Sequence, residues 1–464
     1  MVKLRPCRAI GTLVLSLSAA CGSEDPTGPV DPIFYRTTVA ANPVNSLSAI
    51  ATVEAARYDS AVVRFWRAGE TPEQTPAFRF GADSMLRVPV LGLHASSSYL
   101  LETLVYVDDA PTRADTAEFI SGPMPAWIPA ISTIGTDTTP GLLAASLPDG
   151  PIIVDNQGRV RWYVHLPGNT LTSLQTHANG RYSLFGLTDP DRFDILNELG
   201  ETIGSASCQG FPTRFHDFLM LPGGDYWILC DDTRVLDLTA HGGVANASVS
   251  GTVIQHISAD GQLLFQWNAF DHFAITDLPA LDRSGPNVNF THGNAIAIDT
   301  DGNIIASFRS LSEITKIDAT TGDVIWRFGG LANQFTFVND PKGTFERQHG
   351  VRLAGPGQLQ FLDNGLSAPS RLVRYLLNPV TKTALLVMSF EDAPSTFTQV
   401  GGSTDYFPDG HANVSYGRAG RVIEVDPAGN RAWELAGLDG TYVFRAERIT
   451  NLYRPIPVSR SREP

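Results

Sequence analysis

Apolar and polar residues alternate along most of this chain, in short runs separated by Gly-containing turns. Three of these runs begin with a histidine, at His216, His292 and His349, and each continues through an apolar strand, a turn and a second apolar strand. Alternation with a period of two and a short Gly turn are typical of a β-hairpin. Similar blocks repeated along one chain indicate a repeat architecture with one blade per block.

Six such blocks occupy residues 136–455, at a spacing of roughly 50 residues, which is in the range of propeller blades. Outer strands often end in a tryptophan, and the small, polar segment from Thr239 to Val253 is an expected insertion in the third block. We therefore predict a six-bladed β-propeller, with an array of β-sandwiches as the alternative. The blocks begin near Gly141, Leu171, His216, His292, His349 and Asp405.

Residues 33–128 carry a different pattern, with alternating strands expected over residues 46–53, 60–66 and 98–107. Tyr99 ends a Leu-Gly-Leu-rich segment in the manner of a tyrosine corner. These features predict an immunoglobulin- or fibronectin-like β-sandwich ahead of the propeller. The Pro-rich stretch of residues 122–129 marks the boundary between the two domains.

The N-terminus has the pattern of an export signal. Lys3, Arg5 and Arg8 precede an apolar stretch over residues 9–20 that is too short to span a bilayer. We predict a signal peptide over residues 1–20, a lipidated Cys21 and a tether over residues 21–32, which together favour a periplasmic or cell-surface lipoprotein of the outer membrane. A cleaved signal with an incidental cysteine is the alternative.

Net charge and cysteine content limit the possible partners of the protein and the state of its cysteines. The 464 residues carry a net charge of −14, which argues against nucleic acid or an anionic membrane as the main partner. Cys208 and Cys230 form an even pair in an oxidising compartment, so we expect either a disulfide, worth about 3 kcal/mol in the chain-entropy model, or two buried thiols.

The candidate chemistry lies in His216, His292, His349 and Arg309. The sequence has no phosphate-binding loop, no Gly-x-Ser-x-Gly elbow and no Cys-x-x-Cys, so a nucleotide cofactor is not expected. Equivalent positions in successive blades surround one axis, where three imidazoles and a guanidinium would bind an oxyanion. Crowding of cations lowers the pKa of each histidine and keeps an attacking imidazole neutral.

Two other interpretations of these residues remain open. Propeller histidines often only hydrogen-bond to neighbouring blades, although three at equivalent positions beside Arg309 favour a site. A three-histidine metal site is the second alternative, and the adjacent cation argues against a dication. Asp217 is interpreted as a strand-start side chain.

Six segments of the chain resemble the bacterial arylsulfate sulfotransferases, which move sulfuryl groups between phenols without a nucleotide. The most specific is His292-Gly-Asn, followed by Arg309, the Gly-Asp-Val-Ile-Trp326 run and Gln348-His349. That family carries a β-sandwich before a six-bladed propeller, in agreement with the pattern above. The segments are residues 290–295, 304–318, 321–330, 348–351, 361–365 and 421–426.

The resemblance implies a ping-pong reaction with no cofactor and no metal. His349 matches the family nucleophile that takes the sulfuryl group transiently, and His216, His292 and Arg309 match the residues that hold the sulfate oxygens. The implied partners are a phenolic sulfate donor and a phenol acceptor. The competing functional class is a non-catalytic surface lipoprotein whose propeller binds a glycan or a protein.

Overall fold

The computed structural model describes residues 35–457, apart from residues 109, 368 and 456. Strands make up 48% and helices 3% of the structure, so the predicted all-β class is confirmed. No helix in this part of the chain has the length and apolarity needed to cross a bilayer. The expected signal peptide, Cys21 and the tether lie outside the described residues. The helical segments are α1 (Ala269–His272), η1 (Thr239–His241), η2 (Ile275–Asp277) and η3 (Gly417–Ala419).

Two antiparallel sheets lie at the N-terminal side and enclose one apolar core. Buried Val53 and Val88 of one sheet pack with Val63 and Leu101 of the other. The Tyr99 hydroxyl accepts the backbone N–H of His94 at 2.8 Å, as expected of a tyrosine corner. The first sheet has the order β1 (Tyr35–Ala41), β2 (Ala49–Ala55), β6 (Met85–Val90); the second has β4 (Glu73–Gln74), β3 (Ser60–Trp66), β7 (Ser98–Val107), β8 (Ala110–Ile120), with β5 (Phe78–Arg79) also paired to β3.

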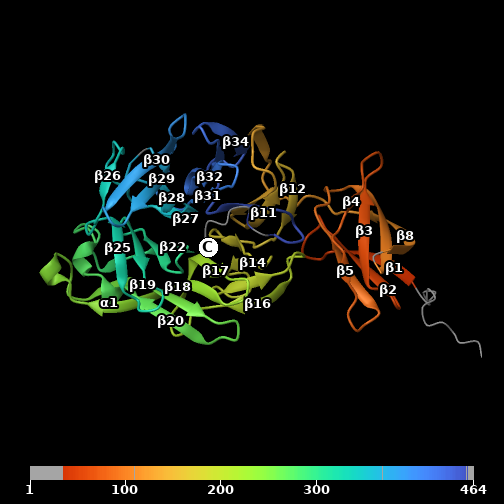
Figure 1. The fold of residues 1–464 in the computed structure, drawn as a ribbon, viewed down its shortest axis with the longest axis horizontal. Coiled ribbons are helices and arrows are strands. Elements are labelled where there is room, and N and C mark those ends of the chain that lie inside the picture. Colours follow the sequence, from red (N-terminus) through yellow and green to blue (C-terminus); the bar gives the residue numbers. More distant parts are fainter. Residues whose placement is uncertain (1–34, 109, 368, 456, 458–464) are drawn as a thin grey trace, which may run out of the picture.

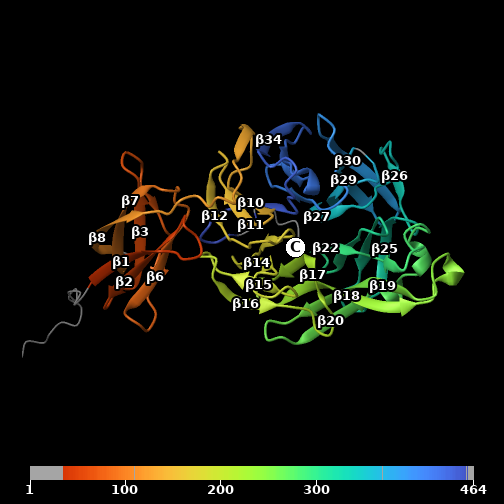
Figure 2. The same ribbon diagram turned by 180° about the vertical axis from the view of Figure 1, so that it is seen from behind.

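Six further sheets follow, named here sheet 1 to sheet 6, and they surround a common centre to one side of the N-terminal pair (Figures 1 and 2). Sheet 1 contains β12 (Val160–Tyr163), β11 (Gly150–Val154), β10 (Leu142–Leu147) and β35 (Ala446–Ile449). Sheet 2 contains β13 (Leu174–Thr176), β14 (Tyr182–Phe185), β15 (Phe193–Leu196) and β16 (Thr202–Ala206). Sheet 3 contains β17 (Thr213–Met220), β18 (Tyr226–Leu236), β19 (Ala247–Ile257) and β20 (Leu263–Asn268), with β21 (Asn287–Asn289) parallel to β19.

The remaining three sheets continue the same antiparallel order. Sheet 4 contains β22 (Gly293–Ile298), β23 (Ile304–Phe308), β24 (Glu313–Ile317) and β25 (Val324–Gly329). Sheet 5 contains β27 (His349–Gly355), β28 (Gln358–Asp363), β29 (Arg371–Asn378) and β30 (Thr383–Glu391), with β26 (Thr336–Val338) parallel to β30. Sheet 6 contains β31 (Ser403–Tyr406), β32 (Ala412–Ser415), β33 (Val422–Val425), β34 (Arg431–Ala436) and β9 (Ser132–Gly135).

Strand pairing between the two ends of this region, and a shared apolar core, link the first and last sheets. The late strand β35 completes sheet 1, and the early strand β9 extends sheet 6, so both ends of this region are paired. Separate apolar clusters fill the space between each sheet and the next. One more cluster joins sheet 6, through Trp433 and Leu435, to sheet 1, through Leu143 and Val154. Apolar clusters therefore connect each of the six sheets to the next, all the way around the centre.

The outer-strand tryptophans join neighbouring sheets through one repeated contact. Trp162 of β12, Trp267 of β20 and Trp433 of β34 are each at most 1% exposed. Each indole N–H donates to a turn carbonyl of the following sheet, on Glu198, Gly322 and Asn156 respectively, at 3.0–3.1 Å. A large apolar ring with one polar group thereby fills the intersheet core and keeps its donor satisfied.

The expected insertion at Thr239–Val253 consists of a connection around η1 and the first part of β19. Strands β18 and β19 pair in unbroken register from Tyr226 opposite Ile257 to Leu236 opposite Ala247, so the small, polar residues extend a long hairpin. Only the segment around η1 is a connection. This strand was not predicted from the sequence, because Ser, Thr and Gly lower the apolar alternation that identifies a strand.

Candidate active site

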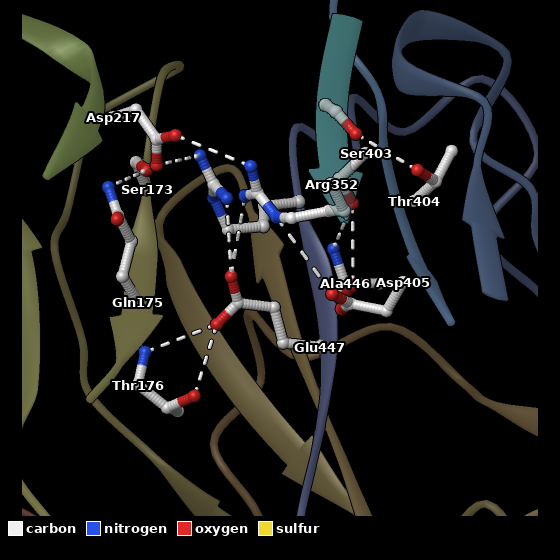
Figure 3. A network of polar contacts seen from close by, with 12 residues as sticks. Ser173, Gln175, Thr176, Asp217, Arg352, Ser403, Thr404, Asp405, Ala446 and Glu447 are labelled. Carbon is white, nitrogen blue, oxygen red and sulfur yellow. Dashed lines mark hydrogen bonds and ion pairs between the residues drawn. The ribbon is translucent and has the colours of Figure 1, made fainter. Parts of the chain in front are cut away.

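A layer of buried polar contacts joins the inner strands of all six sheets, and Figure 3 shows the part of it around Asp217, Arg352 and Glu447. Asp217 of β17 accepts the backbone N–H of Ile296 in β22 at 2.9 Å and forms an ion pair with Arg352 of β27. Arg352 also lies 3.9 Å from the carboxylate of Asp405 in β31. Glu447 of β35 accepts both the backbone N–H and the hydroxyl of Thr176 in β13. These contacts fix the position of the residues next to them in each strand.

His216 and His292 lie next to this layer and contact each other. Their Nε2 atoms are 3.1 Å apart and their ring centroids 4.7 Å apart, although the residues are 76 positions apart in the chain. Asn289 Nδ2 lies 2.5 Å from His292 Nδ1 and can only donate, so His292 carries its proton on Nε2 and donates it to His216. The His216 carbonyl accepts a bond from Arg445 at 2.7 Å, which anchors the backbone.

His349 opens β27 and is held in one tautomer. Its Nδ1 lies 2.7 Å from Asn364 Oδ1 and 3.1 Å from the carbonyl oxygen of Arg347, and both of these atoms are acceptors. The Asn364 amide nitrogen donates to the carbonyls of Thr398 and Gly401, which fixes the amide orientation. His349 Nδ1 therefore carries the proton, and the lone pair is on Nε2.

Burial and neighbouring cations keep these imidazoles neutral. Burial, and then the charge of Arg309, lowers the pKa of His349 to about 3. The pKa of His216 and that of His292 are held well below the usual value by burial first. His216 and His349 are 4% and 3% exposed, whereas His292 is half-buried and marks the solvent side of the cluster. All three rings are thus uncharged near pH 7.

Arg309 supplies the cation beside the imidazoles. It follows β23, its backbone N–H donates to the His292 carbonyl at 3.0 Å, and its Nη2 donates to the carbonyl of Gln399 at 3.1 Å. It forms no ion pair with a described carboxylate, and its Nε has no partner among the described residues. Burial, and then Arg347, lowers the pKa of Arg309. The Arg309 guanidinium thus lacks an anionic partner among the described residues.

The four residues singled out in the sequence lie together in the structure, on and beside the inner strands of three successive sheets. A family model described as arylsulfotransferase (ASST) matches residues 195–437, a region that contains all four. The chain belongs to the arylsulfotransferase family. No curated protein matches the chain in a sequence comparison.

Several solved structures are similar to part of this arylsulfotransferase-family chain. A protein of unknown function from Bacteroides caccae is 12% identical, with coverage of 66% of this chain and 99% of the other and a TM-score of 0.42. A streptogramin B lyase is 11% identical, with coverage of 71% and 92% and a TM-score of 0.37. Virginiamycin B lyase from Staphylococcus aureus is 10% identical, with coverage of 66% and 87% and a TM-score of 0.36.

Two further cations lie near the histidines of this arylsulfotransferase-family chain and were not predicted from the sequence. Arg214 acts on the pKa of both His216 and His292, and Arg347 on that of His292. Each arginine stands two residues before a site histidine, in Arg-Phe-His216 and Arg-Gln-His349, and this repeated Arg-x-His spacing is the signal that was overlooked. Unlike Arg309, both are paired with a carboxylate, Arg214 with Asp231 and Arg347 with Asp282.

Aromatic rings adjoin His216 and were also missed. Phe215 lies with its ring centroid 4.1 Å from that of His216, and Phe444 lies 5.8 Å from His216 and 5.2 Å from Phe215. Tyr442 continues the group 6.2 Å from Phe444. Aromatic side chains beside the cations are the surface that an aryl substrate requires.

Cys208 and Cys230 form the disulfide, which joins the approach to β17 with β18. Asp217 is a buried ion-pair partner of Arg352 and Arg445 rather than only a strand-start side chain. Among the described residues, no group of three or more His, Cys, Asp or Glu side chains is arranged to hold a metal ion.

Proposed function

We propose that this member of the arylsulfotransferase family transfers a sulfuryl group from a phenolic sulfate to a phenol by a ping-pong mechanism, with His349 as the nucleophile. The observation that carries the proposal is the tautomer of His349. Its two Nδ1 acceptors place the lone pair on Nε2, and a pKa of about 3 keeps that lone pair available at neutral pH.

In the first half-reaction, the lone pair of His349 Nε2 attacks sulfur as the bond from sulfur to the aryl oxygen breaks. The phenolate leaves with the electron pair of that bond. The Arg309 guanidinium binds the sulfuryl oxygens, and His292, beside His216, exchanges His216 for a sulfuryl oxygen as the acceptor of its Nε2–H. Positive charge develops on the His349 ring, and the Nδ1–H bonds to Asn364 and Arg347 strengthen as it does.

In the second half-reaction, an acceptor phenol oxygen attacks sulfur and the bond from sulfur to Nε2 breaks. The electron pair returns to His349, which regains its starting tautomer. The acceptor loses one proton and the first phenolate gains one, so the overall exchange is neutral in protons and needs no cofactor.

We further propose that sheets 1 to 6 are the blades of a six-bladed propeller over residues 136–455, preceded by an immunoglobulin- or fibronectin-like sandwich over residues 33–128. The continuous set of intersheet cores supports this arrangement. We also propose an exported lipoprotein anchored in the outer membrane at Cys21. The disulfide supports export, because such bonds persist in oxidising compartments.

The test is release of 4-nitrophenol from 4-nitrophenyl sulfate, with and without phenol as acceptor. We expect His349→Ala to abolish release in both cases, and His272→Ala, which removes an exposed histidine outside the cluster, to leave it unchanged. Incubation with donor alone is expected to leave an acid-labile adduct about 80 Da heavier on the peptide that contains His349.

Equal release by the wild type and by folded His349→Ala would refute the nucleophile assignment. A wild type that is inert toward a panel of aryl sulfates would instead favour the binding-module alternative. An adduct on His216 or His292 would keep the reaction class and reassign the nucleophile.

A further inference from the structure

Three residues that carry a side chain adopt the left-handed backbone conformation in and beside the histidine cluster. The φ angle is 52° at His292, 52° at Ser312 and 57° at Arg347. This region favours glycine, and a residue with a Cβ stays there only where its surroundings hold it. Residues held in this way are concentrated at functional sites, so the contacts that hold these three bear on function.

A continuous set of hydrogen bonds runs through these three residues from sheet 4 to sheet 5. The His292 carbonyl accepts the backbone N–H of Arg309 at 3.0 Å, and the Arg309 carbonyl accepts that of Ser312 at 3.1 Å. The Ser312 hydroxyl then accepts the backbone N–H of Arg347 at 3.2 Å. The Arg347 carbonyl in turn accepts the Nδ1–H of His349 at 3.1 Å. The segment that positions Arg309 is therefore bonded, step by step, to the proposed nucleophile.

Within this set, the step from sheet 4 to sheet 5 is made by the Ser312 side chain. Ser312 is half-buried and lies in the turn between β23 and β24. Two other contacts hold the neighbouring chain: Gln348 Nε2 donates to the Glu313 carbonyl at 2.9 Å, and the Arg347 guanidinium pairs with Asp282. Both of these contacts are made by side chains of the β27 approach. Ser312 instead accepts the main-chain N–H of Arg347, so it acts directly on the φ angle of that residue.

We propose that Ser312 is a positioning residue for the donor half-reaction: it holds Arg347 in the left-handed conformation that directs the Arg347 carbonyl at His349 Nδ1. This inference rests on the proposed function. The carbonyl is one of two acceptors that stabilise the positive charge on the His349 ring as Nε2 attacks sulfur. Because that charge develops only during the reaction, loss of Ser312 lowers the maximal rate and leaves the affinity for the donor unchanged.

Two substitutions of Ser312 separate the hydrogen bond from the backbone conformation. Ser312→Thr keeps an acceptor hydroxyl but places a β-branched residue at a φ of 52°, so we expect a lower Tm and a rate close to that of the wild type. Ser312→Gly adopts this φ freely but has no acceptor for the Arg347 N–H, so we expect the higher Tm of the two and a rate about tenfold below the wild type. Single-turnover release from 4-nitrophenyl sulfate with excess enzyme gives the maximal rate and the half-saturating concentration, and calorimetry gives Tm.

A second measurement does not depend on turnover. In protein labelled with nitrogen-15 histidine, the Nδ1–H resonance of His349 is identified by its loss in His349→Ala. Hydrogen bonding moves an imidazole N–H resonance downfield, so we expect an upfield change in Ser312→Gly and none in Ser312→Thr. Ser310→Ala is the matched control, because the described hydrogen bonds of Ser310 use its backbone only. It is expected to match the wild type in both rate and resonance.

Rates that follow Tm, with Ser312→Thr slower than Ser312→Gly, would overturn the inference, and so would equal rates in the two variants. An unmoved His349 resonance in Ser312→Gly would also overturn it. If Ser312→Thr does not fold, the comparison of Ser312→Gly with the wild type and Ser310→Ala decides. Failure of the proposed function is seen separately, as a wild type that releases no 4-nitrophenol, and the resonance then tests the placement of the Arg347 carbonyl by itself.

Discussion

Substitution of Asn364 tests whether the tautomer and charge state of His349 control the reaction. In the wild type His349 has a pKa of about 3, so its neutral form predominates at every pH above about 4. The pKa of His216 and that of His292 are also low, so no site imidazole titrates in the neutral range. The rate of the donor half-reaction is therefore expected to be flat from pH 5 to 9.

Asn364→Asp puts a carboxylate in place of the amide oxygen that lies 2.7 Å from His349 Nδ1. A full charge about 4 Å away, at an effective dielectric constant of 20, favours the imidazolium by about 4 kcal/mol, which is roughly three pH units. The midpoint of His349 then moves to near pH 6. Protonation removes the Nε2 lone pair, so the variant is expected to lose activity as the pH falls through that value.

Asn364→Ala is the matched control. Both variants lose the amide bonds to the carbonyls of Thr398 and Gly401. The Thr398 carbonyl keeps the Ser370 hydroxyl at 3.4 Å, whereas the Gly401 carbonyl is left unsatisfied at a cost of about 1–3 kcal/mol of stability. Only the Asp variant adds charge, so only it should acquire an acidic limb. The assay is single-turnover release from 4-nitrophenyl sulfate with excess enzyme at pH 4–9, read after an alkaline quench. A wild-type inflection between pH 5 and 8, or identical profiles for the two variants, would refute this reasoning.

Three further outcomes follow from the structure. Arg309→Ala is expected to slow the donor half-reaction about 10²–10³-fold. Arg309→Lys is expected to recover part of this rate, because an ammonium keeps the charge but lacks the planar fork of a guanidinium. The rate of the 4-nitrophenol burst measures both effects. The double variant Cys208→Ala, Cys230→Ala is expected to lose about 3 kcal/mol of stability while it retains turnover once folded, as measured by denaturant unfolding and assay. Trp433→Phe is expected to lower Tm more than Trp326→Phe, since only Trp433 donates to a described carbonyl, that of Asn156; equal shifts in calorimetry would remove the role given to that bond.

The sequence was sufficient for much of the strand pattern because the alternating residues are buried on one or both faces. The six first strands begin at Leu142, Leu174, Thr213, Gly293, His349 and Ser403, within three residues of the expected block starts. It failed between Thr239 and Val253, where pairing with β18 rather than side-chain hydrophobicity makes the strand. It also gave no sign that β9 pairs with β34, since a four-residue edge strand carries too few residues for a period to show.

Only those residues of the candidate site that belong to recognisable strand segments could be predicted from the sequence. His216, His292, His349 and Arg309 were found because each lies at the start or end of a recognisable strand. Asn364 belongs to a segment already noted for its resemblance to the family, but its role depends on a bond across 15 residues of sequence. Phe444, with Tyr442 beside it, comes from the last part of the chain, and Phe444 reaches His216 because it lies just before β35, which completes sheet 1.

The arrangement of charge explains how one centre can both hold the fold together and leave a cation for a ligand. Arg352 and Arg445 are almost fully buried, and each is paired with Asp217 and a second carboxylate, so their charges are used within the protein. A buried guanidinium without such partners would cost several kcal/mol. Arg309 is only partly buried and has no carboxylate of its own, so the cost of leaving it unpaired is lower. In the proposed reaction the sulfate group of the donor is the anionic partner of Arg309, and the imidazoles beside it stay neutral.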